Sequence, residues 1–354
     1  MPLSRLRCLQ TYLNGMGPMG KIIDERRVYS DSRFSDLRKA LKQAPDICAN
    51  RACVYATGSF GRREASPHSD LDLFIVSLSD EKDGADRSHL SKLNEILLKA
   101  ELIRASKELM FPDFSQDGRF LQHHTEKRLI RSTGNQYDDY ENTFTARLLL
   151  LLESMPLAGA DVHSKVIDDV IEKYWREYPD HYDCFMPAFL ANDILRYWRT
   201  LCLNYEASTI ERPKSEQVLR DRAKRKIKNY KLKHSRMLTC YSAVLYLLFV
   251  YGRSATVTVA DAQRMVSLTP TARVEFVGNE LNGSDPARCI DDLLGKYEHF
   301  LDVTSVSEDE LIGLFSDDTE AHRLRDEQSS FGDLAYEVLY SIGNKNALYR
   351  RLVI

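Results

Sequence analysis

Apolar residues in the first third of the chain follow two different periods. Short apolar runs at 53–57 and 71–78 predict two strands, and the second run is nearly continuous, as in a sheet covered on both faces. Residues 119–123 are a weaker candidate for a third strand. Residues 1–50 and 89–110 have helical spacing instead. The apolar stripe of 89–110 that we expect to face inward consists of Leu90, Leu93, Ile96, Leu97 and Ile103.

After about residue 130 the spacing is helical almost throughout. Leu148 to Leu152 are five consecutive leucines, which predicts a helix buried on nearly every side. Near the C-terminus, Ser307 to Glu310 match a capping box, and a last apolar stripe ends at Gly343. The pattern therefore predicts an α/β (α+β) chain, with a small sheet domain in residues 1–130 and a mostly helical domain in residues 131–354.

Two acidic residues stand one residue apart where the second predicted strand begins. Because strand side chains alternate between faces, we expect Asp70 and Asp72 to share one side, with Leu71, Leu73 and Phe74 on the other. Two carboxylates in that arrangement can share hard divalent cations such as Mg²⁺. An Asp-x-Asp pair by itself is more often a solvated strand end, so the neighbouring residues must decide between the two readings.

A Gly-Ser turn precedes the two aspartates by ten residues, directly after the first predicted strand. Gly58 has no Cβ, so the backbone N–H groups of Gly58 and Ser59 can approach a phosphate closely. Arg62 and Arg63 follow the turn and supply positive charge. The turn and the carboxylate pair together indicate a site for a metal ion and a phosphate.

Composition narrows the class of protein. The chain has 354 residues and a net charge of −3, which does not suggest a protein that coats nucleic acid. Its apolar runs fall short of the roughly 18 residues that cross a bilayer, and residues 1–13 lack the apolar stretch of a signal peptide. The seven cysteines are scattered without a Cys-x-x-Cys pair, which favours reduced thiols. We expect a cytoplasmic protein with no membrane partner.

The spacing of the turn and the aspartates resembles the signature of the DNA polymerase β superfamily of nucleotidyltransferases. The resemblance implies a small mixed-sheet catalytic domain and two metal ions, Mg²⁺ or Mn²⁺, that stabilise the attacking and leaving oxygens. It also implies that Asp70 and Asp72 are shared metal ligands. Gly58 and Ser59 then hold the β- and γ-phosphates of a nucleoside triphosphate, and Arg62 or Arg63 neutralises the pyrophosphate or clamps the acceptor.

The longer string from Gly58 to Glu64, with Ser66 to Asp70, is closer to one branch of that superfamily. It resembles the bacterial uridylyltransferases that modify nitrogen-regulatory PII proteins, and their short relatives of unknown acceptor. A weaker similarity covers residues 151–159, where the branch has an acidic residue and an arginine before an apolar pair and Ala-Gly. In this chain Met155 replaces that arginine.

A third carboxylate normally completes such a site, and two residues compete for the role. Asp117 lies just before the candidate third strand, although Asp117-Gly118 is equally consistent with a simple turn. Glu153 follows the five leucines, where a carboxylate is costly unless it is paired or bound to a ligand. Asp113 is a weaker candidate. We expect Asp117 to be the third metal ligand, with Glu153 as the rival catalytic carboxylate.

The stretch 212–236 is strongly basic, with eleven Lys or Arg and only two acidic residues. Such a run is usually a solvated helix face, and the functional alternative is a contact with a triphosphate or an RNA backbone. Lys231 and Ser235 are four residues apart, so they share a face of an α-helix. Members of the superfamily often reach the triphosphate with a lysine and a serine of the helical domain, so the resemblance implies that these two residues bind the nucleotide.

The motif and the resemblance together favour a metal-dependent enzyme that moves a nucleoside monophosphate from an NTP to an acceptor. A protein side chain, an RNA 3′ end such as that of tRNA, or a small molecule are all open as acceptors. The alternative is a non-catalytic nucleotide-binding or scaffold protein with a degenerate transferase domain. Intact Asp70 and Asp72 speak for the enzyme.

Overall fold

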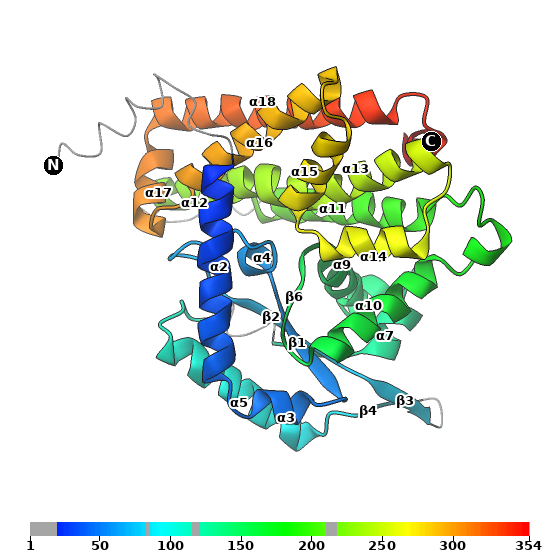
Figure 1. The fold of residues 1–354 in the computed structure, drawn as a ribbon. Helices are drawn as coiled ribbons and strands as arrows, with labels where there is room; N and C mark the ends of the chain where they lie inside the picture. The colour runs from blue at the N-terminus through cyan, green and yellow to red at the C-terminus, as the bar shows by residue number, and fades with distance from the viewer. Residues whose placement is uncertain (1–19, 83–84, 115–120, 210–217, 354) are drawn as a thin grey trace.

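The computed structural model describes residues 20–82, 85–114, 121–209 and 218–353. A small sheet region and a larger group of helices lie side by side, which confirms the mixed α/β class predicted from the sequence (Figure 1). The elements of the sheet region are α2 (Lys21–Ala40), α3 (Ala44–Cys48), β1 (Ala52–Thr57), α4 (Gly58–Gly61), β2 (Asp72–Ser77), β3 (Ser79–Lys82), β4 (Ala85–Ser88), α5 (Lys92–Glu108), β5 (His123–Thr125) and β6 (Met155–Ala158).

Four strands form one mixed sheet in the order β5-β2-β1-β6. β1 is antiparallel to both β2 and β6, whereas β5 runs parallel to β2. The two strands expected at 53–57 and 71–78 are therefore confirmed, and the structure shows that they are neighbours in the sheet. Their register pairs Thr57, the last residue of β1, with Asp72, the first residue of β2. The Gly-Ser turn and the aspartates consequently lie at the same end of the sheet.

Both faces of the sheet are covered, which explains the nearly continuous apolar run of β2. Leu73 and Ile75 belong to a cluster with residues of α2, α3 and α5. Phe74 and Val76 point to the opposite face, into a cluster that includes α9 and α10. The expectation that Phe74 lies on the face of Leu73 was wrong, because alternation places it with Asp72.

The helical region follows β5 in the chain and is interrupted once by β6. Its elements are α7 (Glu126–Arg131), α8 (Tyr137–Tyr140), α9 (Thr143–Glu153), α10 (Ala160–Tyr174), η1 (Tyr178–Asp180), α11 (Ala188–Thr209), α12 (Val218–Lys231), η2 (Leu232–Arg236), α13 (Met237–Ser254), α14 (Val259–Ser267), α15 (Pro270–Glu280), α16 (Asp285–Val303), α17 (Glu308–Ser316), α18 (Asp318–Gly343) and α19 (Ala347–Val353). The expected capping box is confirmed at Ser307 and Glu310. Among the described residues, no helix is both long and apolar enough to cross a membrane.

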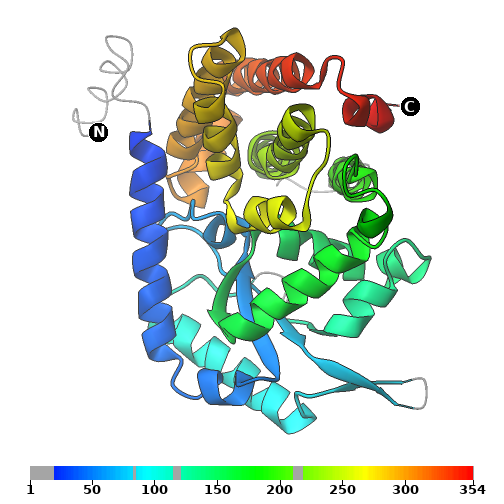
Figure 2. The ribbon, with the colours of Figure 1, turned by 45° about the vertical axis from the view of Figure 1, so that its right-hand side comes forward.

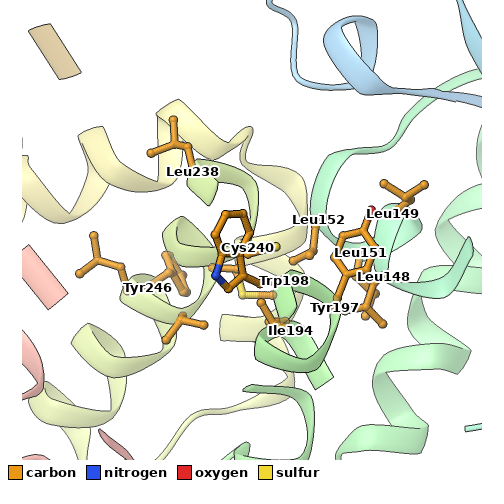
Figure 3. Close-up of a cluster of buried hydrophobic side chains, with 14 of the residues drawn as sticks. Leu148, Leu149, Leu151, Leu152, Ile194, Tyr197, Trp198, Leu238, Cys240 and Tyr246 are labelled. Atoms are coloured by element: carbon orange, nitrogen blue, oxygen red, sulfur yellow. The ribbon is translucent and has the colours of Figure 1, made fainter. Parts of the chain in front are cut away.

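The five leucines of α9 are the centre of the largest core. All five are buried, as expected. They share a cluster with side chains of α11 and α13, among them Trp198 and Tyr246 (Figure 3). At the end of α9 the chain turns directly into β6, so the core helix and the edge strand of the sheet meet at Glu153.

Three local features differ from what the sequence pattern predicted. The charged segments 79–82 and 85–88 form the two-stranded hairpin of β3 and β4, which the pattern did not predict. β6 was not expected, because it is short and contains Pro156, which is tolerated at a sheet edge. The stripe expected to face inward on α5 is largely exposed, with Leu93 and Leu97 at 73% and 52%, whereas Leu98 is fully buried.

Helix α2 runs along one side of the molecule and connects its two parts (Figures 1 and 2). At its N-terminal end, Glu298 of α16 accepts hydrogen bonds from the N–H groups of Gly20 and Ile22. Towards its other end, Phe34 and Leu37 are buried in the cluster beneath the sheet. α2 therefore contacts both α16 and the cluster that includes α5, and it holds these two helices in fixed positions relative to each other.

Candidate active site

The Gly-Ser turn, where β1 passes into α4, lies directly against Asp72, the first residue of β2. Gly58 has a φ of 65°, in the left-handed region that favours glycine. A Cβ atom at Gly58 would lie 2.8 Å from Oδ2 of Asp72. A Cβ at Gly61 would lie 2.0 Å from the carbonyl oxygen of Glu153. Both glycines therefore permit close contacts, and the turn, the aspartate and the end of α9 form one compact unit.

The two aspartates form a pair whose charges repel each other. Asp70 is exposed and Asp72 is half-buried. Burial, and then the charge of Asp70, raise the pKa of Asp72 to about 6, although Arg236 acts in the opposite direction. Carboxylates held close together suit a hard divalent cation, which would remove their repulsion. The residues present thus fit Mg²⁺, with Asp70 and Asp72 as its donors.

The third expected metal ligand, Asp117, lies outside the described residues. Within the described ranges there is no cluster of three or more His, Cys, Asp or Glu side chains that could hold a metal ion. Strand β5 begins at His123 and runs parallel to β2, with His123 paired to Ile75. The start of β5 is therefore directed towards the same end of the sheet as Asp72.

Glu153 is fully buried and uses both of its carboxylate oxygens. Oε1 accepts a hydrogen bond of 3.1 Å from the N–H of Gly58 and is paired with Arg236. Oε2 accepts hydrogen bonds of 2.9 Å from Arg62 and from the hydroxyl of Thr239. Burial by itself would raise the pKa of Glu153, but Arg236 and Arg62 outweigh it and lower the pKa to about 2. Glu153 is thus a permanent anion that joins the Gly-Ser turn to α13.

The two arginines after the turn are both engaged in ion pairs. Arg62 is buried between two carboxylates, because its Nε donates to Glu64 at 2.7 Å while Nη1 donates to Glu153. Burial would lower the pKa of Arg62, but Glu153 and Glu64 raise it well above its usual value. Arg63 points to α2 and pairs with Asp31 through Nε at 2.8 Å and through Nη2. Both guanidinium groups therefore hold the loop in place.

The basic stretch enters the site through a wide turn, η2, between α12 and α13. This turn is π-helical, so side chains five residues apart share a face. Arg236 reaches Glu153, and Lys231 interacts electrostatically with Asp70. Desolvation lowers the pKa of Lys231, and Asp70 acts in the opposite direction. Ser235 is buried, and its hydroxyl donates to the carbonyl of Lys231 at 2.9 Å.

The structure brings most of the expected site residues to one end of the sheet. Ser59 is half-buried as the second residue of α4, beside Gly58. Thr239 and the pairing of Arg236 with Glu153 were not anticipated. The signal was a carboxylate at the end of a leucine run, which requires buried partners. A cation and a hydroxyl three residues apart, Arg236 and Thr239, stand where the basic stretch passes into α13.

Much of the remaining basic stretch has a structural role. On α12, Arg220 and Lys224 pair with Asp309 and Glu308 of α17, at 2.7 and 2.8 Å. Residues 210–217 lie outside the described residues. These exposed ion pairs agree with the solvated-face interpretation for the first part of α12, and among the described residues of the basic stretch it is Lys231 and Arg236 that interact with Asp70 and Glu153.

The comparisons with known proteins agree with this geometry. A search of curated proteins found no match. Residues 35–113 match the family model described as a nucleotidyltransferase domain, and this segment contains Gly58, Ser59, Asp70 and Asp72. The match supports nucleotidyl transfer as the general activity and a nucleoside triphosphate as the donor. Residues 35–113 thus match a nucleotidyltransferase domain, which is consistent with the DNA polymerase β superfamily.

Proposed function

We propose that this protein is a divalent-metal-dependent nucleotidyltransferase that moves a nucleoside monophosphate from an NTP to an acceptor and releases pyrophosphate. The observation that carries the proposal is the contact of the Gly58 turn with Asp72, in a segment that matches a nucleotidyltransferase domain. A phosphate-binding turn and a pair of repelling carboxylates are the two parts that such a reaction requires side by side.

Asp70 and Asp72 are the proposed ligands of two divalent ions, Mg²⁺ or Mn²⁺. When bound, these ions neutralise charge on the attacking and the leaving oxygens. Asp117 is the proposed third ligand, because β5 begins at the same end of the sheet as Asp72. Glu153 is less suited to that role, since its oxygens are already bound to Gly58, Arg62, Arg236 and Thr239.

The triphosphate is proposed to lie between the Gly-Ser turn and the last turn of α12. The N–H of Gly58 is held by Glu153, so the donors for phosphate are the next N–H groups of α4, beginning at Ser59. Lys231 supplies positive charge from the other side. Arg62, Arg63 and Ser235 support the nucleotide indirectly, because their polar groups hold the loop and the wide turn.

In the proposed reaction, the acceptor forms a bond from its nucleophilic atom to the α-phosphorus while the bond to the β-phosphate oxygen breaks. Asp117 accepts the proton of the acceptor hydroxyl as general base. Lys231 and the N–H groups of α4 stabilise the charge that grows on the leaving pyrophosphate.

The test is incubation of the purified protein with each α-³²P-labelled NTP, Mg²⁺ and a cell lysate. We expect label transfer to one acceptor class, protein, RNA or small molecule, and loss of transfer in the Asp70→Ala/Asp72→Ala variant. The exposed Asp46→Asn on α3 is the matched control that keeps activity. Calorimetry of NTP binding, with and without Mg²⁺, distinguishes the enzyme from the alternative. If no label is transferred, and NTP binding needs no metal and survives the double substitution, the protein is a non-catalytic nucleotide-binding protein.

A further inference from the structure

The loop that follows the Gly-Ser turn is held by three separate elements. Arg62 is bound to Glu153 at the end of α9, and Arg63 is bound to Asp31 of α2. Glu64 accepts a hydrogen bond of 2.8 Å from the hydroxyl of Tyr297, which belongs to α16. Successive residues of the loop therefore depend on helices that are distant in the sequence.

Residue 65 continues this pattern through its backbone. The N–H of Ala65 donates to the hydroxyl of Ser30 at 3.0 Å, and its carbonyl accepts from Arg26 at 3.3 Å. Arg26 also donates to the carbonyl of Leu301 on α16 at 2.9 Å. α2 and α16 thus hold the end of the loop together.

Five charged or polar side chains form one continuous and largely buried charge network, in the order Arg236, Glu153, Arg62, Glu64 and Tyr297. We infer that Tyr297 and Glu64 are positioning residues for the nucleotide, because this network transmits the position of α16 and η2 to the backbone of the Gly-Ser turn. The inference rests on the proposed function and extends it to residues that touch neither phosphate nor metal.

The geometry of the network makes its links interdependent. Tyr297 is fully buried, so its hydroxyl has no water to replace the oxygen of Glu64. Oε2 of Glu64 receives both Tyr297 and Arg62, whereas Oε1 is buried with no hydrogen-bond partner in the described chain. Among the described residues, loss of the Tyr297 hydroxyl would leave Arg62 as the remaining side-chain donor to Glu64. Arg62 would then turn towards Glu64 and loosen its bond to Glu153, which holds Gly58.

The matched pair of variants is Tyr297→Phe and Tyr230→Phe. Both rings are buried and both contact Phe300, with centroids 5.3 and 5.5 Å from it. The hydroxyls differ, because that of Tyr230 is buried with no hydrogen-bond partner in the described chain. Glu64→Gln is the second variant, since it keeps the side-chain size and removes the charge between Arg62 and Tyr297.

The first readout is hydrogen exchange of the peptide 55–66 without nucleotide, measured by mass spectrometry, so that the amide of Gly58 lies inside the peptide. Because the N–H of Gly58 is bonded to Glu153, its protection reports the network directly. We expect exchange at least about ten-fold faster in Tyr297→Phe and Glu64→Gln, and unchanged exchange in Tyr230→Phe. Equal exchange in Tyr297→Phe and wild type overturns the inference, as does equal acceleration in both tyrosine variants.

The second readout is steady-state transfer kinetics. Loss of a prepositioned binding loop weakens substrate and transition state alike, so KM for the NTP should rise about ten-fold while kcat stays within about three-fold. A change in kcat alone, with KM unchanged, overturns the inference. If the wild type transfers no label but the exchange pattern holds, the proposed function fails while the network still stands as the support of the turn.

Discussion

Asp72 and Gly58 are in such close contact that Oδ2 of the aspartate would lie 2.8 Å from any Cβ at residue 58. Thr57, the residue before Gly58, is paired with Asp72 across β1 and β2. The proposed phosphate-binding turn and the proposed metal-binding carboxylate are therefore adjacent in space, although ten residues separate Ser59 from Asp70 in the chain. This relationship makes residue 58 a sensitive position for chemistry as well as for folding.

Gly58→Ala should lower both stability and activity. The left-handed φ of 65° costs an alanine about 1–2 kcal/mol, and its methyl group must displace the carboxylate of Asp72. Because small misplacements at a reacting centre are costly, the displaced carboxylate should reduce transfer about 100-fold. Gly283→Ala is the control, since Gly283 has a φ of 80° with no atom within 4 Å of its Cβ position. Gly283→Ala should lose a similar amount of stability in thermal unfolding but keep full transfer activity. Equal losses of activity in the two variants would contradict the role assigned to Gly58.

Glu153→Gln should be strongly destabilising. The substitution removes the buried anion that pairs with Arg236 and leaves Arg62 with Glu64 alone, and breaking a buried ion pair costs about 3–5 kcal/mol. Glu141→Gln breaks the exposed pair with Arg128 and should cost less than about 1 kcal/mol. Urea unfolding of the two variants measures the difference. Similar midpoints would show that Glu153 does not hold the turn.

Stability should fall in acid partly because of Glu153. The arginines lower the pKa of its carboxyl from the ordinary 4.5 to about 2, so its contribution is complete above pH 4.5 and is lost between there and about pH 2. The difference in Tm between wild type and Glu153→Gln should therefore shrink as the pH falls through that window. Melting curves at several pH values test this. A constant difference across the window would mean that protonation of Glu153 is not involved.

Lys231→Ala should weaken NTP binding, whereas Lys228→Ala should not. Both lysines are exposed on α12, and Lys231 is the one that interacts electrostatically with Asp70 at the site. We expect KM for the NTP to rise roughly ten-fold for Lys231→Ala, with a weaker dependence of binding on salt. Steady-state kinetics at two ionic strengths measures both effects. Equal changes for the two lysines would indicate a general charge effect instead of a specific contact.

Leu98→Ala and Leu97→Ala test which face of α5 is buried. Leu98 is fully buried beneath the sheet and Leu97 is 52% exposed. The first substitution should cost about 2–5 kcal/mol, and the second about 0.5 kcal/mol or less. Chemical denaturation of the two variants gives both values. The reverse order would support the inward stripe expected from the spacing alone.

Parts of the fold follow from local pattern because local physics determines them. The apolar runs of β1 and β2, the leucines of α9 and the capping box at Ser307 are confirmed. Each of these features depends on residues that are close together in the sequence. The charged hairpin of β3 and β4 was missed because it has no apolar period, and β6 because a proline-containing edge strand looks like a loop.

The orientation of α5 shows a different limit. Its apolar residues occupy two overlapping faces, one with Leu93 and Leu97 and the other with Leu98 and Leu102. Both sets have helical spacing, so periodicity alone cannot select between them. The sheet and α2 select the second set by the contacts that they offer.

The sequence by itself determined the reaction class, since the Gly-Ser turn and the two aspartates have their spacing built into neighbouring strands. Only the tertiary structure decided the roles of Arg62, Glu153 and Arg236. These charges come from a loop and two helices, and a buried charge is stable only where opposite charges from elsewhere in the chain meet it. The π-helical turn η2 belongs to the same category, because it places Arg236 at Glu153 while the hydroxyl of Ser235 donates to the carbonyl of Lys231. Partners distant in the sequence leave no periodic trace in it, so their meeting is a property of the fold.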